Sequence, residues 1–241
     1  MRTLLLTASA LLISAPAVAA DLSARPAPPY GAPQLPLWTG FYVGANAGGA
    51  VGTANSDFSV AGTTFASVDN SLTGAVAGGQ AGYNWQNGPM VYGLEADIQY
   101  SSASGTLSAP CVPGLCGLPL TANYTQEMSW FGTVRGRVGY ASGGWLIYAT
   151  AGYAYGDLKT NANASAAGTT ATFSATDFVD GWTAGGGIEV QVAPRWSVKG
   201  EYLYADFGRA NHTVAFTGLP AITDSANVTL NIVRAGVNFR F

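Results

Sequence analysis

The 241-residue chain is short of charged residues and has no long apolar run. Charged residues make up 10% of the sequence, well below the fraction of about 25% in an ordinary soluble domain. After the N-terminal segment no 18 consecutive residues are apolar, which argues against a membrane-spanning helix. A net charge of -3 argues against nucleic acid as a partner. Sparse charge combined with 12% aromatic residues indicates a β-barrel in lipid, whose strands present one apolar face.

Histidine and cysteine are also scarce. The single histidine, His212, cannot form a zinc site from this supply of ligands. Asp206 and Asp224 lie near it in sequence, but nothing marks a nucleophile for a serine hydrolase. We therefore expect no enzymatic activity, no metal and no cofactor.

Two cysteines, Cys111 and Cys116, enclose the sequence Val-Pro-Gly-Leu. In an oxidising compartment this spacing favours a small loop closed by a disulfide. A redox or metal role is the alternative, which the Pro-Gly turn and the lack of an accompanying histidine disfavour.

The N-terminus indicates the compartment. Arg2 precedes an apolar run over 4–13, and Ala17-Val18-Ala19 fits a cleavage pattern. We predict a secretory signal peptide over residues 1–20; a membrane anchor is the alternative, but the apolar run is too short for one. Residues 21–37 are rich in proline and predict an extended periplasmic linker.

From Trp38 to Phe241 the sequence alternates with period two, and we assign 38–241 to one barrel domain. Eight alternating segments are predicted as strands, at approximately 41–52, 72–86, 90–101, 125–141, 144–158, 178–193, 195–207 and 228–241.

Short and long connections between these segments alternate. The short ones are Asn87-Gly88-Pro89, Ser142-Gly143 and Ala193-Pro194, and the long, polar ones are 53–71, 102–124, 159–177 and 208–227. This pattern is typical of an outer-membrane barrel with tight periplasmic turns and long extracellular loops. The fold class predicted is therefore all-β: an eight-stranded antiparallel transmembrane β-barrel with both termini in the periplasm.

Within the strands, the charged residues alternate with apolar residues, such as Leu94 and Ile98, that we expect to face lipid. The two kinds of residue therefore lie on opposite faces of the strand. The charged residues are Glu95, Asp97, Arg135, Arg137, Glu189, Lys199, Glu201 and Arg234. A charge facing hydrocarbon costs roughly 2–4 kcal/mol at the midplane, so we expect these eight to point into the lumen. Acids and bases fall on adjacent strands, which favours cross-strand pairs that plug the barrel. The alternative is a narrow ion path lined by the basic members.

Aromatic residues on the face of each strand that we expect to contact lipid gather near the strand ends. We expect them to form two girdles at the level of the lipid headgroups. One group is Phe41, Trp85, Tyr92, Tyr140, Trp145, Trp196 and Phe241, and the other is Tyr100, Trp130, Tyr155, Trp182 and Tyr204.

Three stretches resemble a known family. Trp38-Thr-Gly-Phe-Tyr-Val-Gly-Ala-Asn-Ala-Gly-Gly49, the Ala-Ala-Asp21 region and the final Val-Asn-Phe-Arg-Phe241 are similar to the small alphaproteobacterial outer-membrane proteins labelled porin-family or OmpA-like β-barrel, of the surface-antigen type. The resemblance implies location in the bacterial outer membrane. It also implies that Val237, Phe239 and Phe241 form the signal for the barrel-assembly machinery.

These patterns predict a non-enzymatic protein that supports the integrity of the envelope and displays its loops outside. The alternatives are a narrow porin or transporter of haemin or another small solute, a loop-mediated adhesin, and a soluble carrier resembling a lipocalin. The partners expected are outer-membrane lipid and the barrel-assembly machinery, with no nucleic acid, and we expect a monomer.

Overall fold

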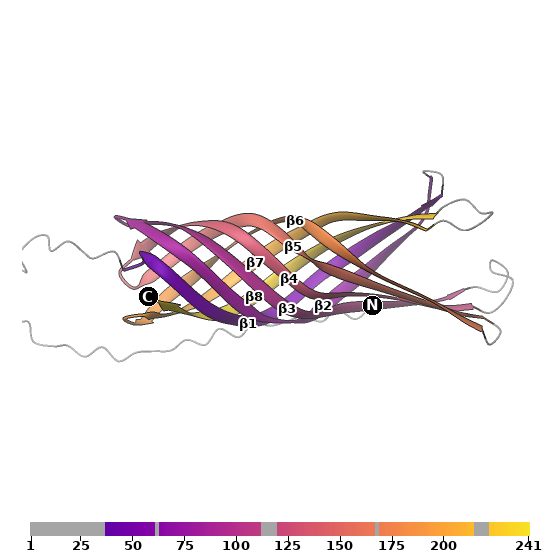
Figure 1. Cartoon of the computed structure of the whole chain (residues 1–241), viewed down its shortest axis with the longest axis horizontal. Coiled ribbons are helices and arrows are strands. Elements are labelled where there is room, and N and C mark those ends of the chain that lie inside the picture. The colour runs from indigo at the N-terminus through magenta and orange to yellow at the C-terminus, as the bar shows by residue number, and fades with distance from the viewer. Residues whose placement is uncertain (1–36, 61–62, 112–119, 167–168, 215–221) are drawn as a thin grey trace, which may run out of the picture. The chain divides into compact units, whose positions relative to one another are not determined.

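The computed structural model describes residues 37–60, 63–111, 120–166, 169–214 and 222–241. These residues form eight antiparallel strands that follow one another around a closed barrel (Figure 1). The strands are β1 (Gly40–Val60), β2 (Thr63–Asn87), β3 (Met90–Cys111), β4 (Leu120–Ser142), β5 (Trp145–Ala166), β6 (Thr169–Ala193), β7 (Trp196–Val214) and β8 (Ile222–Arg240). No helix in the described ranges is long and apolar enough to cross a membrane. The predicted strand number and antiparallel order are confirmed.

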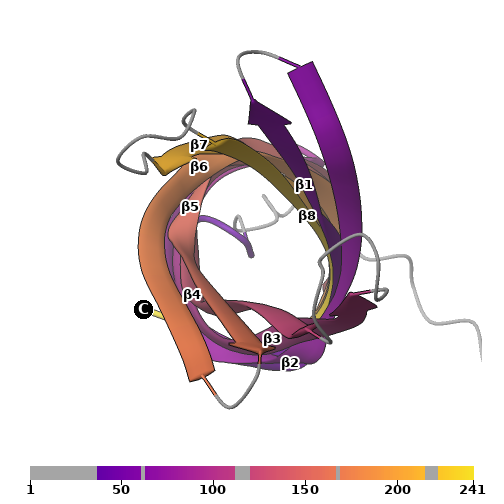
Figure 2. The same cartoon turned by 90° about the vertical axis from the view of Figure 1, so that its right-hand side faces the viewer.

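Pairing between the first and last strands closes the ring. β1 and β8 are antiparallel from Tyr42↔Arg240 to Val60↔Ile222 without a shift in register. Figure 2 shows the strands as this ring. Closure gives the backbone groups of β1 and β8 a partner strand on each side, which is the condition for a sheet to exist in hydrocarbon.

Three tight turns join the strands at one end of the barrel, which we call the turn end. They connect β2 to β3, β4 to β5 and β6 to β7, as predicted. Gly88 and Gly143 adopt φ values of 60° and 57° in the first two turns. Glycine occupies this left-handed region without the steric cost that a Cβ adds, so both positions favour glycine.

The opposite end, which we call the hairpin end, differs from the prediction. The four stretches expected to be long loops are mostly strand, and β1 and β2 continue until only residues 61 and 62 separate them. Pairs of threonines bridge these extensions: Thr53 Oγ1 lies 3.1 Å from Thr229 Oγ1, and Thr106 Oγ1 lies 3.1 Å from Thr125 Oγ1. The prediction failed because it needed an apolar face to recognise a strand. A hairpin that is polar on both faces keeps its ladder of backbone hydrogen bonds but loses that contrast.

The outer wall of the barrel is apolar. No residue predicted to face lipid is buried, and large side chains such as Leu94, Ile98, Ile147 and Val233 are 57–66% exposed. Most girdle aromatics are exposed too, whereas Trp130, Tyr155 and Tyr204 are half-buried. A continuous apolar surface of this kind marks a site of association with membrane or protein, because burying it away from water is favourable.

We expect an arginine at Ala149 to destabilise the barrel by about 2–4 kcal/mol, because this exposed residue lies midway along the wall segment of β5. Ala149→Leu is the matched control and should be tolerated. Urea unfolding of both variants in lipid vesicles, followed by tryptophan fluorescence, measures the difference. If Ala149→Arg left the free energy of unfolding unchanged, water and not lipid would cover this wall.

Candidate functional site

The interior of the barrel holds all eight strand charges that the sequence placed there. None of them is more than 5% exposed. Four are acids and four are bases, so their formal charges cancel. They come from five strands: Glu95 and Asp97 on β3, Arg135 and Arg137 on β4, Glu189 on β6, Lys199 and Glu201 on β7, and Arg234 on β8. We call this set the charge network.

Arg135 lies at the centre of the charge network. Its Nη2 donates to Glu95 Oε1 at 2.5 Å and to Asp97 Oδ2 at 2.7 Å, both on the neighbouring strand. Its Nη1 donates to Glu201 Oε1 on β7 at 3.1 Å. β4 and β7 are not neighbours in the barrel, so the guanidinium joins strands across the lumen.

The other bases complete the pairing. Arg234 donates through Nε to Glu201 at 2.8 Å and through Nη2 to Asp97 at 2.9 Å. Lys199 Nζ lies 2.9 Å from both carboxylate oxygens of Glu95. Each of these carboxylates therefore contacts at least two cations, which offsets much of the cost of removing it from water.

Glu189 and Arg137 form a second pair nearer the turn end, at 2.9 Å. Ser197 Oγ donates to Glu189 at 2.5 Å, and Asn238 Nδ2 donates to it at 2.9 Å. Gln80 continues the chain by donating to Asn238 at 2.8 Å. Neutral polar side chains thus extend the charge network around the barrel wall.

Two buried tyrosines belong to the network and were missed by the sequence analysis. Tyr42 donates to Glu95 at 2.8 Å, and Tyr148 donates to Glu201 at 3.0 Å. The guanidinium carbon of Arg137 lies 4.0 Å from the centre of the Tyr148 ring, close enough for a cation–π contact. The Tyr42 ring passes close over Gly82, where a Cβ would lie 2.4 Å from its hydroxyl oxygen. The sequence signal that could have revealed this placement is a tyrosine paired with an inward glycine on the neighbouring strand, as Tyr42 is with Gly82.

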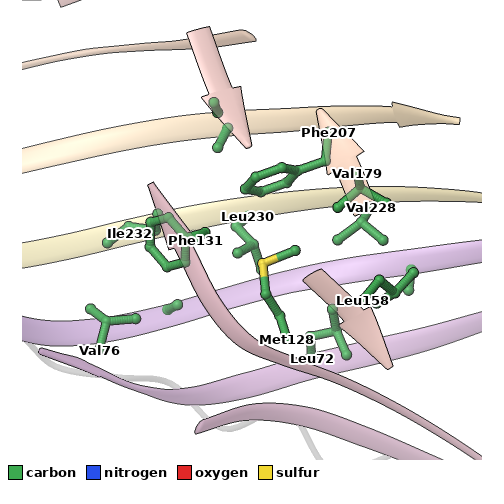
Figure 3. Packing of buried hydrophobic residues seen from close by; sticks show 14 of the residues in the cluster. Leu72, Val76, Met128, Phe131, Leu158, Val179, Phe207, Val228, Leu230 and Ile232 are labelled. Atoms are coloured by element: carbon green, nitrogen blue, oxygen red, sulfur yellow. The ribbon is translucent and has the colours of Figure 1, made fainter. Parts of the chain in front are cut away.

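An apolar zone fills the lumen between the charge network and the hairpin end. It comprises Ala50, Ala54, Leu72, Val76, Met128, Phe131, Ala154, Leu158, Val179, Leu203, Ala205, Phe207, Val228, Leu230 and Ile232, all at most 4% exposed. Figure 3 shows these side chains converging from several strands. The Phe131 and Phe207 rings pack edge to face with centroids 6.2 Å apart.

The apolar zone was not predicted. Along β7 the inward residues change from Lys199 and Glu201 to Leu203, and along β8 from Arg234 to Ile232. The change from charged to apolar occurs between successive inward-facing residues, which lie about 7 Å apart along the strand. The prediction assigned apolar residues to lipid, so apolar residues of the inward parity were not considered.

A smaller cluster closes the turn end. Trp38 is fully buried and packs in one cluster with Val91, Ala141, Leu146 and Tyr148. Its backbone N–H donates to Gln86 Oε1 at 3.0 Å. The Arg240 guanidinium carbon lies 4.7 Å from the centre of the Trp38 ring, and Arg240 also donates to the Leu37 carbonyl. Trp38, two residues before the start of β1, therefore contacts the end of β8 inside the lumen. We call this set of residues the turn-end cluster.

The remaining predicted sites lie elsewhere. Val237 and Phe241 are exposed on the outer wall and Phe239 is half-buried there, with the Phe239 and Phe241 ring centroids 5.3 Å apart. The predicted signal peptide and all of the predicted linker except Leu37 lie outside the described residues. So do Cys116 and the side chain of Cys111.

A closed antiparallel barrel with an apolar wall and its ionised groups inside is an integral outer-membrane β-barrel protein. The chain belongs to the family of the outer membrane protein beta-barrel domain, whose model matches residues 5–241. This confirms the predicted family and the location in the outer membrane. On that basis the turn end faces the periplasm and the hairpin end faces outward.

Curated relatives support the same assignment. The 31 kDa outer-membrane immunogenic protein of Brucella melitensis is 36% identical over 258 residues, with 100% of both chains covered. The 22 kDa outer membrane protein of Rhizobium leguminosarum is 31% identical over 206 residues, covering 85% of this chain and 78% of the relative.

Solved structures support the fold alone. The outer membrane protein OprG of Pseudomonas aeruginosa has a TM-score of 0.53 at 12% identity, covering 84% of this chain and 97% of its own. The outer membrane protease OmpT of Escherichia coli has the same TM-score at 11% identity, with the same coverage.

We expect Arg135→Met to lower the free energy of unfolding by about 3–5 kcal/mol, because it leaves three buried carboxylates with one cation fewer. Arg195→Met, at an exposed position of the β6–β7 turn, is the matched control and should change stability by less than about 0.5 kcal/mol. Urea unfolding in detergent micelles compares the two. Equal stabilities would show that the charge network is hydrated and weakly coupled.

Proposed function

We propose that this protein is a non-enzymatic, non-conducting barrel that stabilises the outer membrane and carries rigid hairpins on the cell surface. The observation that supports this most directly is the order of the three groups inside the lumen. The turn-end cluster is followed by the charge network and then by the apolar zone. A hydrated ion would have to pass all three.

The charge network opposes conduction because its charges are already paired. An ion entering it would compete with contacts such as Arg135–Asp97 at 2.7 Å and Arg234–Glu201 at 2.6 Å. The apolar zone opposes conduction by a different mechanism. An apolar constriction excludes water and therefore raises the free energy of an ion inside it.

The same arrangement weighs against the rival ion path. That path would be lined by Arg135, Arg137, Lys199 and Arg234, but each of these bases contacts at least one buried acid. A basic path also ends at the apolar zone. Among the residues that the structure describes, none specifically supports binding of haemin or transport of another small solute.

The partners of the wall follow from its chemistry. We propose outer-membrane lipid around the apolar face and recognition of Val237, Phe239 and Phe241 by the barrel-assembly machinery. We also propose a monomer, because the ring closes within one chain, and no nucleic-acid partner, because the net charge is -3. We also propose a disulfide between Cys111 and Cys116. The relatives' names, which describe outer-membrane proteins and no reaction, support a protein without catalysis.

We expect no unitary current steps when the purified protein is reconstituted into planar bilayers, because the lumen holds two separate barriers. Lys199→Gln should be equally silent, since it leaves the apolar zone intact. A general porin reconstituted in parallel controls for insertion. Discrete steps from the wild type, with an ion selectivity that changes in Lys199→Gln, would contradict the proposal and favour the narrow pore.

We expect cells that lack this protein to admit more of a dye that an intact outer membrane excludes. The wild type and Arg195→Met should restore the barrier equally, because Arg195 is exposed in the β6–β7 turn and lies outside the charge network. Dye uptake measured by fluorescence gives the comparison. Unchanged uptake in the cells lacking the protein would argue against the structural role.

A further inference from the structure

The hairpin end of the barrel divides into two four-stranded sheets. In the first sheet, β3, β4, β5 and β6 stay paired as far as Cys111↔Leu120, Leu120↔Ala166 and Ala166↔Thr169. In the second sheet, β7, β8, β1 and β2 stay paired as far as Val214↔Ile222, Val60↔Ile222 and Val60↔Thr63. Figure 1 shows the strands of the two sheets diverging at this end.

Two seams separate the sheets. In the described part of the chain, the ladder between β2 and β3 reaches no farther than Thr73↔Ser104, and that between β6 and β7 no farther than Trp182↔Asp206. Farther toward the hairpin end, each sheet has two edges whose described residues pair with no strand across the seam. Such an edge is a template for pairing with another chain, and proteins usually protect it.

Three of the four edges carry a recognisable protection. On β3, Pro110 removes a backbone donor, and Asn70 of β2 donates across the seam to the Gly105 carbonyl at 2.9 Å. The free edge of β2 is covered at its base by that same side chain. On β7 a register shift lies between Asp206 and Arg209, and Asp206 Oδ1 accepts from the Gly208 N–H at 2.9 Å.

The free edge of β6 lacks these protections. Its ladder with β5 runs without a shift from Trp145↔Val190 to Ala166↔Thr169, so the strand is regular throughout. The segment Thr169–Gly181 contains no proline, lysine or arginine and is rich in threonine, with Phe178 and Val179 near its end. The backbone of β7 still lies against Asp180 and Gly181, so the free part of the edge is residues 169–179. This part is a regular strand roughly 35 Å long, composed largely of residues with high β-propensity.

We propose that this free edge of β6 is a docking site for an extended, basic polypeptide segment that joins the β3–β6 sheet as an added strand. Backbone hydrogen bonds along residues 169–179 supply the attachment, as in other cases of strand addition. The proposal does not depend on whether the lumen conducts.

Charge selects a basic occupant. Asp180 lies on the segment itself and Asp157 is paired directly with Phe178, whereas Lys159, paired with Thr176, is a base on the same two strands. Asp206 and Arg209 of β7 lie at the base of the seam with opposite charges, so the balance beside the edge stays acidic. Asp180 is exposed and accepts a hydrogen bond from the Tyr153 hydroxyl at 2.9 Å, which leaves its charge in place. A second copy of this chain is a poorer occupant, because its own β6 segment contains Asp177 and Asp180 and no lysine or arginine.

The side chains beside the edge indicate what an added strand would contact. Thr172, Ser174, Thr176, Phe178 and Asp180 share one parity and are all exposed, with Phe178 at 65%. Alternate residues of an added strand would lie beside this row. An apolar residue would pack against Phe178, and a basic residue would pair with Asp180.

The test uses the full chain in detergent micelles and a labelled peptide of about twelve residues that alternates lysine with valine and threonine. Fluorescence anisotropy should show binding of this peptide. A control peptide in which glutamate replaces each lysine should bind about tenfold more weakly. The loss of two exposed ion pairs can account for a difference of this size. A peptide of the same composition interrupted by proline should not bind, and hydrogen exchange should slow in residues 169–179 only with the lysine peptide.

A charge swap tests the location of the site. The variant Thr172→Lys/Thr176→Lys keeps the backbone edge, so it should now prefer the glutamate peptide. Thr106→Lys/Thr125→Lys adds the same charge near the opposite edge of the same sheet and should keep the wild-type preference. A gel shift between boiled and unboiled samples verifies that each variant still forms the barrel.

Three outcomes would overturn the proposal. One is equal binding of the lysine and glutamate peptides, and another is binding without slower exchange in residues 169–179. The third is concentration-dependent association of the protein that itself protects this segment, since a second copy would then be the occupant.

Discussion

The structure depends on one constraint: hydrocarbon offers no hydrogen bonds to the backbone, so every N–H and C=O within it must be paired in the chain. Pairing of β1 with β8 meets this constraint and removes both edges of the sheet. Once the ring is closed, the two faces of each strand meet different surroundings. The outward face contacts lipid, and the inward face encloses a lumen of eight strands that side chains can fill.

The charge network follows from this division. A charged residue in the wall can only point inward, and there it needs a partner because it is buried. Arg135 contacts acids on β3 and β7, which joins opposite sides of the ring. Buried pairs of this kind add little net stability over apolar packing, but breaking one is costly. We therefore regard the network mainly as a device that holds the strands in one arrangement.

The apolar zone and the free edge of β6 belong to the part of the barrel where the constraint weakens. Toward the hairpin end the ring divides, and β2 and β3 separate beyond Thr73↔Ser104. Side chains such as Leu203, Leu230 and Phe131 fill the lumen below this division. Above it water can satisfy an unpaired backbone, so free edges are permitted there, and this is where the protein can meet another chain.

Particular residues show how far the sequence predicts this structure. Alternation in a stretch such as Tyr92–Tyr100 predicted the strand and its lipid face, because one face is apolar and the other carries Glu95 and Asp97. Around Ile232 and Val233 both faces are apolar, so the pattern could not separate the apolar zone from the wall. Tyr42 was missed because an aromatic residue was expected outside, and the hairpin extensions were missed because both of their faces are polar.

The central claim is that hydrocarbon contacts the apolar parity of every wall strand. Spin labels placed singly at positions 91–100 of β3 test it through their collision rates with oxygen, which concentrates in hydrocarbon. We expect maxima at Tyr92, Leu94, Ala96, Ile98 and Tyr100 and minima at the positions between them. Maxima at Glu95 and Asp97, or no alternation along the strand, would contradict the account.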